Sequence, residues 1–145
     1  MQVKQSVKLF NAVRFKWKEV NILLLKEGFI DEWIVDRTGG GQEIAQTQEG
    51  KKTRLYAGGT IGIEELTELG LTKKDVTGKL KQFIQSSESK TRLLEDYLPE
   101  PDGDWQYSYN IIEKIEDVPL TIGMETIAYK GRMVFAHAFL NTPVE

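Results

Sequence analysis

Alternating aromatic and polar residues predict strands in the C-terminal third of the chain. Trp105, Tyr107 and Tyr109 alternate with polar residues in the run W-Q-Y-S-Y-N. Residues 121–140 form two further β-rich runs that meet at Lys130-Gly131. Period-two alternation with aromatic and β-branched residues is typical of strands whose two faces differ. The pattern therefore predicts an aromatic strand followed by two long strands in a tight hairpin.

The middle of the chain predicts two helices. Residues 61–69 form a short helical segment that Gly70 ends. Thr72 and Asp75 have the spacing of a capping box, so a second helix is expected from there to about residue 87. Its apolar stripe consists of Val76, Leu80, Phe83 and Ile84.

The N-terminal region supports two interpretations. Apolar residues three and four apart fit one amphipathic helix, whereas Val13, Phe15 and Trp17 alternate with basic residues as in a strand. We predict a helix to about Ala12, an ambiguous middle and a second helix over residues 18–27. The run ILLLKEGFIDEWIVD, residues 22–36, resembles a helix-to-strand unit of a small ribosomal protein of the bacterial 30S subunit. That resemblance implies local geometry only.

Glycine and proline clusters predict the connections. The triplet Gly39–Gly41 lacks the surroundings of a phosphate-binding or dinucleotide-binding loop, so we predict a hairpin connection there. A short strand over residues 52–57 is expected to end at Gly58-Gly59, and residues 99–104 form a turn. Short turns favour antiparallel pairing. We predict a single α+β domain over residues 1–145: an antiparallel meander of four to six strands with helices packed on one face.

Composition excludes several kinds of chemistry. The 145 residues suffice for one domain, and 40% of them are hydrophobic. There is no cysteine and only one histidine, and the carboxylates lack an EF-hand pattern. We therefore expect no metal and no cofactor. No membrane-length apolar run or signal peptide is seen, so a cytoplasmic location without membrane contact is expected.

Charge is unevenly distributed, although the net charge is only −3. An excess of basic residues near the N-terminus would suit nucleic acid. The residues of this alternative are Lys4, Lys8, Arg14, Lys16 and Lys18. The acidic stretch at residues 95–117 offers the other interpretation, in which the two segments neutralise each other within the fold or across a homodimer.

The aromatic strand is the main candidate for a binding site. A face carrying Trp105, Tyr107, Tyr109 and Tyr129 could stack against a small ligand or a protein partner. The alternative is that the same face forms a wall of the core. The leading prediction is a non-enzymatic binding or regulatory module that uses this aromatic face.

We expect no catalytic residues, and Glu125 and His137 are the pair that a small hydrolase or isomerase would use. A two-residue loop at Lys130-Gly131 pairs Tyr129 with Arg132 and places Glu125 on the face opposite to His137. A bulge at Gly131 instead brings Glu125 and His137 onto one face. The register therefore decides whether an acid–base pair exists.

Motifs in the last third of the chain resemble a family of small bacterial domains known only as a domain of unknown function. They are Leu94-Glu95, Gly103-x-Trp105-x-Tyr107 and Gly123-x-Glu125-x-x-x-Tyr129-x-Gly131-x-x-Val134. The run Tyr56-Ala57-Gly58-Gly59 is similar to the family's Tyr-Ala-Gly-Gly element, although here two predicted helices follow it. Phe135 stands where the family usually has tryptophan. Some members are fused to helix-turn-helix regulators, so the resemblance implies an α+β fold and a binding or regulatory role without catalysis.

Overall fold

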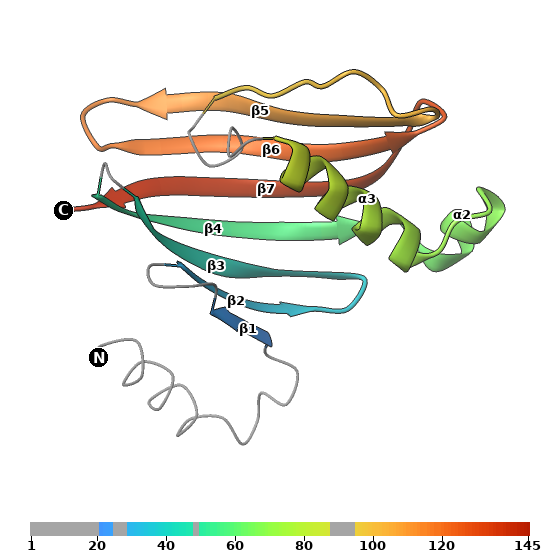
Figure 1. The fold of residues 1–145 in the computed structure, drawn as a ribbon, viewed down its shortest axis with the longest axis horizontal. Coiled ribbons are helices and arrows are strands. Elements are labelled where there is room, and N and C mark those ends of the chain that lie inside the picture. Colours follow the sequence, from blue (N-terminus) through green and yellow to red (C-terminus); the bar gives the residue numbers. More distant parts are fainter. Residues whose placement is uncertain (1–20, 25–28, 48–49, 88–94) are drawn as a thin grey trace.

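An antiparallel sheet dominates the computed structural model, which describes residues 21–24, 29–47, 50–87 and 95–145 (Figure 1). The strands are β1 (Asn21–Leu24), β2 (Phe29–Val35), β3 (Thr38–Thr47), β4 (Gly50–Thr60), β5 (Trp105–Ile115), β6 (Leu120–Tyr129) and β7 (Arg132–Val144). The helices are α2 (Ile63–Glu68) and α3 (Lys73–Ser86). The predicted α+β fold with an antiparallel sheet is confirmed, but the described residues form seven strands and the prediction was four to six. None of the described helices has the length and apolar character needed to span a bilayer.

The strands follow the order β1-β2-β3-β4-β7-β6-β5 (Figure 1). The predicted plain meander is wrong, because β7 and not β5 lies beside β4. The chain leaves the sheet after β4, forms α2 and α3, and re-enters at the far edge. That connection is long enough to cross the sheet, whereas a short turn would have paired β5 with β4.

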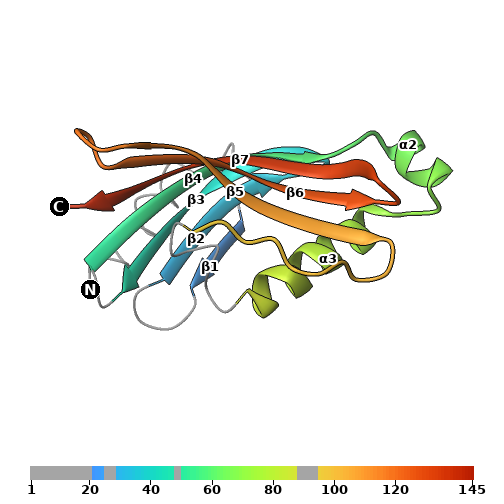
Figure 2. The same ribbon diagram turned by 90° about the horizontal axis from the view of Figure 1, so that it is seen from above.

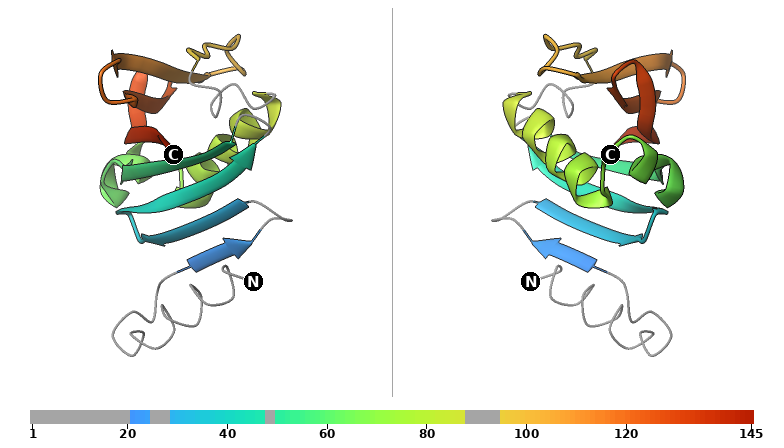
Figure 3. Two further views of the ribbon diagram at one scale, coloured as in Figure 1. Left: turned by 90° about the vertical axis from the view of Figure 1, so that its left-hand side faces the viewer. Right: turned by 90° about the vertical axis from the view of Figure 1, so that its right-hand side faces the viewer.

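Helix α3 begins at the predicted capping box. The Asp75 backbone amide donates to Thr72 Oγ1 over 3.3 Å, and the Thr72 backbone amide donates to the Asp75 carboxylate over 2.7 Å. Figures 1 and 2 show α3 lying across one face of the sheet, which we call the helix face. Figure 3 shows β5–β7 turned relative to β1–β4, with α3 in the angle between them.

Stacked aromatic rings attach α3 to the sheet. Phe83 of α3 lies on Tyr107 of β5 with ring centroids 5.1 Å apart, and Tyr109 stacks on Phe139 of β7 at 4.5 Å. Tyr107 and Tyr109 have no exposed surface. The core therefore lies between α3 and strands β5–β7, and burial of these rings supplies much of its stability.

Two predictions near the N-terminal half are wrong. The helix expected over residues 18–27 is replaced by β1 at Asn21–Leu24, which pairs with β2. The glycine triplet lies inside β3, and the turn before it is at Asp36-Arg37. The glycine triplet is in a strand because β2 and β3 lie very close together there. A Cβ on Gly39 would lie 2.0 Å from the carbonyl oxygen of Ile34, so only glycine allows this approach. The helix expected before Ala12 lies outside the described residues.

The hairpin has the two-residue turn of the first predicted alternative and the shared face of Glu125 and His137 of the second. Lys130 and Gly131, with φ of 49° and 77°, form a two-residue turn, and Tyr129 pairs with Arg132. The register then shifts, because Ala128 pairs with Met133 but Ile127 pairs with Phe135. The bulge thus lies within β7 and not at Gly131. Glu125 consequently pairs with His137, on the same face of the sheet.

Two glycine-to-alanine substitutions should change stability in opposite directions. A Cβ on Gly123 would lie 2.1 Å from Cζ of the buried Phe139 ring, so Gly123→Ala should destabilise the fold by about 1–3 kcal/mol. Gly78 in α3 has no atom within 4 Å of its Cβ position, so Gly78→Ala should stabilise by up to about 1 kcal/mol. Urea denaturation measures both values. Equal effects at the two sites would contradict this packing.

Candidate functional site

A cavity of about 470 Å³ lies between α3 and the β2–β4 side of the helix face. The lining from α3 and its start consists of Lys73, Thr77, Leu80, Lys81 and Ile84. The lining from β2 and the turn that follows consists of Asp31, Trp33, Val35, Asp36 and Arg37. The remaining strands contribute Glu43, Arg54, Tyr56, Gly59, Thr60, Glu125, Phe135 and His137.

Glycines in the sheet leave room for the cavity. Val35 pairs with Gly39, Gly39 with Gly58, and Gly58 with His137, so this row across β2, β3, β4 and β7 has no side chains at its centre. Gly58 has φ of 151°, and a Cβ there would lie 1.9 Å from the carbonyl oxygen of Ala136. Only glycine fits such a backbone, and the same choice keeps the space above it open.

A buried ion pair lies at the inner end of the cavity. Arg54 Nη2 of β4 donates to Glu125 Oε2 of β6 over 3.1 Å, with 12% and 3% of the two side chains exposed. The Tyr107 hydroxyl donates to the other carboxylate oxygen, Oε1, over 3.1 Å. The guanidinium also lies 4.7 Å from the ring centroid of Phe139, a cation–π contact. Strand β7 runs between β4 and β6, so the pair connects two strands that are not neighbours.

The electrostatics of this cluster follow from burial. Burial raises the pKa of Glu125, and Arg54 and the Tyr107 hydroxyl oppose that rise only in part. Burial alone would lower the pKa of Arg54, but nearby carboxylates, Glu125 first, raise it above its ordinary value. The pKa of Tyr107 is raised by burial and by the carboxylate that it contacts. Arg54 and the Tyr107 hydroxyl thus favour the charged form of Glu125 while burial disfavours it, and Tyr107 stays protonated at neutral pH.

His137 is packed between aromatic rings beside this pair. Its ring centroid lies 4.4 Å from that of Phe135 and 5.2 Å from that of Tyr56. Burial, with Arg54 nearby, lowers the pKa of His137 to about 4, so the imidazole is neutral near pH 7. Among the described residues no hydrogen bond joins His137 to Glu125. The two residues do share a face and a cavity, but the carboxylate is committed to Arg54 and Tyr107.

Two buried polar atoms of the lining have no hydrogen-bond partner among the described residues, Arg54 Nε and Thr60 Oγ1. Thr60 is 7% exposed and ends β4, where its carbonyl oxygen accepts from Arg37 Nη1 over 2.7 Å. Buried donors without partners cost about 1–3 kcal/mol each. Both atoms have less than 1 Å² of accessible surface, so packed side chains and not the open space of the cavity lie against them.

A polar row borders the aromatic part of the lining. Asp31 pairs with Glu43, and Glu43 with Arg54, across β2, β3 and β4. Asp31 Oδ1 accepts a hydrogen bond from the Tyr56 hydroxyl over 2.8 Å. At the mouth Lys73 Nζ donates to Asp36 Oδ1 over 2.7 Å and connects α3 to the β2–β3 turn.

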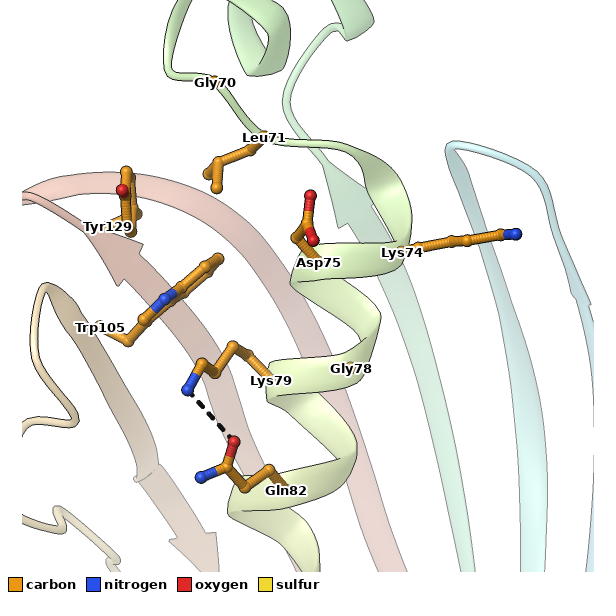
Figure 4. A pocket seen from close by; sticks show the side chains of 9 residues that line it. All are labelled: Gly70, Leu71, Lys74, Asp75, Gly78, Lys79, Gln82, Trp105 and Tyr129. Atoms are coloured by element: carbon orange, nitrogen blue, oxygen red, sulfur yellow. Dashed lines mark hydrogen bonds between the residues drawn. The ribbon is translucent and has the colours of Figure 1, made fainter.

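The four residues of the predicted aromatic face lie in two different environments, the core and an open groove. Tyr107 and Tyr109 are fully buried, so the core-wall alternative holds for them and they form no exposed platform. Trp105 and Tyr129 are partly exposed, with ring centroids 4.7 Å apart. They line a separate open groove of about 420 Å³ beside α3, where Lys79 Nζ donates to Gln82 Oε1 over 3.2 Å (Figure 4).

No local motif indicates two residues of the cavity lining, Arg54 and Thr60. A signal was present in β4, where Arg54, Tyr56, Gly58 and Thr60 alternate as one face of a strand. The partner of Arg54 lies 71 residues away, which no local pattern shows. The basic residues of the nucleic-acid alternative, Lys4 to Lys18, lie outside the described residues. Within the described part of the chain no group of three metal-ligating side chains occurs.

Comparison of the chain with protein-family models, curated proteins and solved structures finds no match.

Removing one partner of the buried ion pair should strongly destabilise the protein. Arg54→Met leaves the Glu125 carboxylate buried without a counter-charge, which should cost about 3–5 kcal/mol in unfolding free energy. Adding Glu125→Gln to that variant should recover most of the loss. Arg132→Met breaks the exposed pair with Glu65 and is the control, with a change below about 1 kcal/mol. Additive effects of the two cavity substitutions in urea denaturation would contradict the pairing.

His137 should make stability fall with acid. The unfolded chain protonates His137 near its ordinary pKa of 6.5, but the folded protein does so only at about 4. The unfolding free energy should therefore fall from pH 6.5 to about 4, by up to about 3.5 kcal/mol at about 1.4 kcal/mol per pH unit. His137→Gln should remove this loss. Glu125, whose raised pKa acts in the opposite sense, remains in both proteins.

The single histidine allows a direct check by proton NMR of the untagged protein. An imidazole titration near pH 6.5 in the folded protein would contradict the buried, neutral state.

Proposed function

We propose that this protein is a non-enzymatic binding module that holds a small, largely apolar molecule in the cavity beneath α3. The observation that carries the proposal is a cavity of about 470 Å³ that apolar and aromatic side chains line beside the buried pair of Arg54 and Glu125. Ligand sites are typically concave, of about 300–1,000 Å³, and mostly apolar with a few polar groups that orient the ligand.

The composition of the lining supports a small molecule over a macromolecule. Trp33, Leu80, Ile84 and Phe135 supply apolar and aromatic surface from both the sheet and the helix. This lining replaces the exposed aromatic face that the sequence predicted, because the tyrosines of that face are in the core. A protein partner, a homodimer and nucleic acid remain predictions.

The enzyme alternative has less support. The register places Glu125 and His137 on one face, which that alternative requires. However, both oxygens of Glu125 already accept hydrogen bonds, one from Arg54 and one from Tyr107. An acid–base catalyst needs a carboxylate or imidazole that can reach the substrate's proton. The arrangement is better suited to holding a fixed electrostatic environment than to transferring protons.

A regulatory role would follow from the position of α3. The resemblance to domains that are fused to helix-turn-helix regulators implies such a role. The helix forms the roof of the cavity through Leu80 and Ile84, so a ligand would contact both layers of the fold. Binding would stabilise the packing of α3 on the sheet by mass action.

Filling the cavity should weaken binding. The probe is 6-propionyl-2-dimethylaminonaphthalene, a neutral apolar dye whose emission shifts to the blue in an apolar site. Wild-type protein should show a saturable shift with one site per chain. Ile84→Trp should weaken binding at least tenfold, because the indole would occupy the space that the dye needs.

The matched control is Gln85→Trp, at the next, exposed helix position, which is not part of the lining. It should bind as the wild type does, and circular dichroism should show that both variants are folded. Absence of saturable binding to the wild type, or equal binding by Ile84→Trp, would overturn the proposal.

A further inference from the structure

We propose that the ligand is an amphipathic anion, with an apolar body inside the cavity and one carboxylate at its rim that pairs with Lys81. This inference rests on the proposed function and specifies the chemistry of the molecule that occupies the same cavity.

Eight charged residues of the described chain line the cavity, and they fall into two groups. The rim group lies on α3 and on the turn after β2, and it consists of Asp36, Arg37, Lys73 and Lys81. The strand group lies on β2, β3, β4 and β6, and it consists of Asp31, Glu43, Arg54 and Glu125. Among these eight, three cations accompany one carboxylate at the rim, whereas three carboxylates accompany one guanidinium on the strands. The lining is therefore polarised, although its charges cancel in total.

The strand group disfavours a carboxylate at that side of the cavity. Arg54, its one cation, already pairs with Glu125 over 3.1 Å. Glu43 pairs with Arg54 across the sheet, and Asp31 lies beside Glu43 in the same row and accepts from the Tyr56 hydroxyl over 2.8 Å. A further carboxylate here would meet an excess of negative charge in a half-buried site. A charged head group is therefore expected at the rim.

Apolar side chains from both layers line the space between the two groups. Trp33 comes from β2, Leu80 and Ile84 come from α3, and Phe135 comes from β7. Such a surface gains free energy from contact with an apolar body, in proportion to the area that is removed from water. The part of the ligand that lies inside the cavity is therefore apolar.

Lys81 is the rim cation that a ligand can use most directly. Lys73 Nζ already donates to Asp36 Oδ1 over 2.7 Å, and Arg37 Nη1 donates to the Thr60 carbonyl oxygen over 2.7 Å. Lys81 is exposed, and no hydrogen bond or ion pair joins it to another described residue. A carboxylate that pairs with Lys81 stays in contact with water, so its charge is not buried.

The other two rim cations act at longer range. Lys73 holds Asp36 and thus places Arg37 near the start of α3, whereas Lys81 lies about 12 Å farther along the helix. That separation exceeds the Debye length of about 8 Å at physiological ionic strength, so their attraction for a carboxylate at Lys81 is partly screened. Most of the preference for an anion should therefore depend on Lys81.

A matched naphthalene series tests the charge of the ligand. The anion is 2-naphthylacetate, the neutral analogue is 2-(2-naphthyl)ethanol and the cation is 2-(2-naphthyl)ethylammonium. Isothermal titration calorimetry near neutral pH should show that the anion binds about fivefold more tightly than the alcohol. The ammonium should bind more weakly than the alcohol. Raising the salt concentration from about 0.05 M to about 0.5 M should remove most of the difference between anion and alcohol.

Three variants test the contact with Lys81. Lys81→Glu should remove the preference, so that 2-naphthylacetate binds no more tightly than the alcohol, whereas Lys81→Arg should keep it. Lys74→Glu is the matched control, because Lys74 is an exposed lysine of the same helix that does not line the cavity. It changes the net charge equally and should keep the preference. The alcohol should bind all three variants as it binds the wild type, which shows that the cavity is intact.

The possible results separate the two proposals. If none of the three probes binds the wild type, the proposed function fails together with this inference. If the alcohol binds and the anion binds no more tightly, the binding module stands and the anionic ligand is wrong. Tightest binding of the ammonium would show that the strand group selects the ligand, which also overturns the inference. If Lys81→Glu and Lys74→Glu weaken binding of the anion equally, the contact with Lys81 is wrong.

Discussion

The ion pair between Arg54 and Glu125 is the constraint on which the arrangement of this fold depends. Both charges are almost fully removed from water, and each would cost several kcal/mol alone. They come from β4 and β6, and β7 lies between those two strands. The pair therefore holds the β1–β4 hairpins and the β5–β7 hairpins in one register, and Tyr107 extends the connection to the edge strand.

The cavity follows from the way in which the two layers are attached. Phe83 and Tyr107 hold α3 against the β5–β7 side, while Lys73 and Asp36 connect its start to the β2–β3 turn. The cavity lies between these two attachments, beside strands in which Gly39 pairs with Gly58 and adds no side chain to the sheet. A helix packed over larger residues would have closed the gap. The open space is thus a consequence of glycine in the sheet as much as of the position of the helix.

The proposed binding role depends on the buried pair of Arg54 and Glu125 and on the cavity beside it. Glu125 compensates the charge of the Arg54 guanidinium, and the neutral His137 adds no further charge to the lining.

The sequence by itself determined the local elements. The alternation from Trp105 to Tyr109, the hairpin at Lys130-Gly131 and the capping box at Thr72 each depend on neighbouring residues, and all three predictions are confirmed. Local preference also suggested a helix where β1 lies, and there strand pairing with β2 prevailed over helical spacing. Part of the site was also predictable, because the alternation of residues allows Glu125 and His137 to share a face.

Only the tertiary structure decided the register, the strand order and the cavity. The bulge within β7 adds one residue and moves His137 to the face of Glu125, although the turn itself has the two residues that predict the opposite. Arg54 meets a carboxylate 71 residues away because the segment between them crosses to the far edge of the sheet. Contacts of this kind depend on how distant strands pair, and no pattern along the chain encodes them locally.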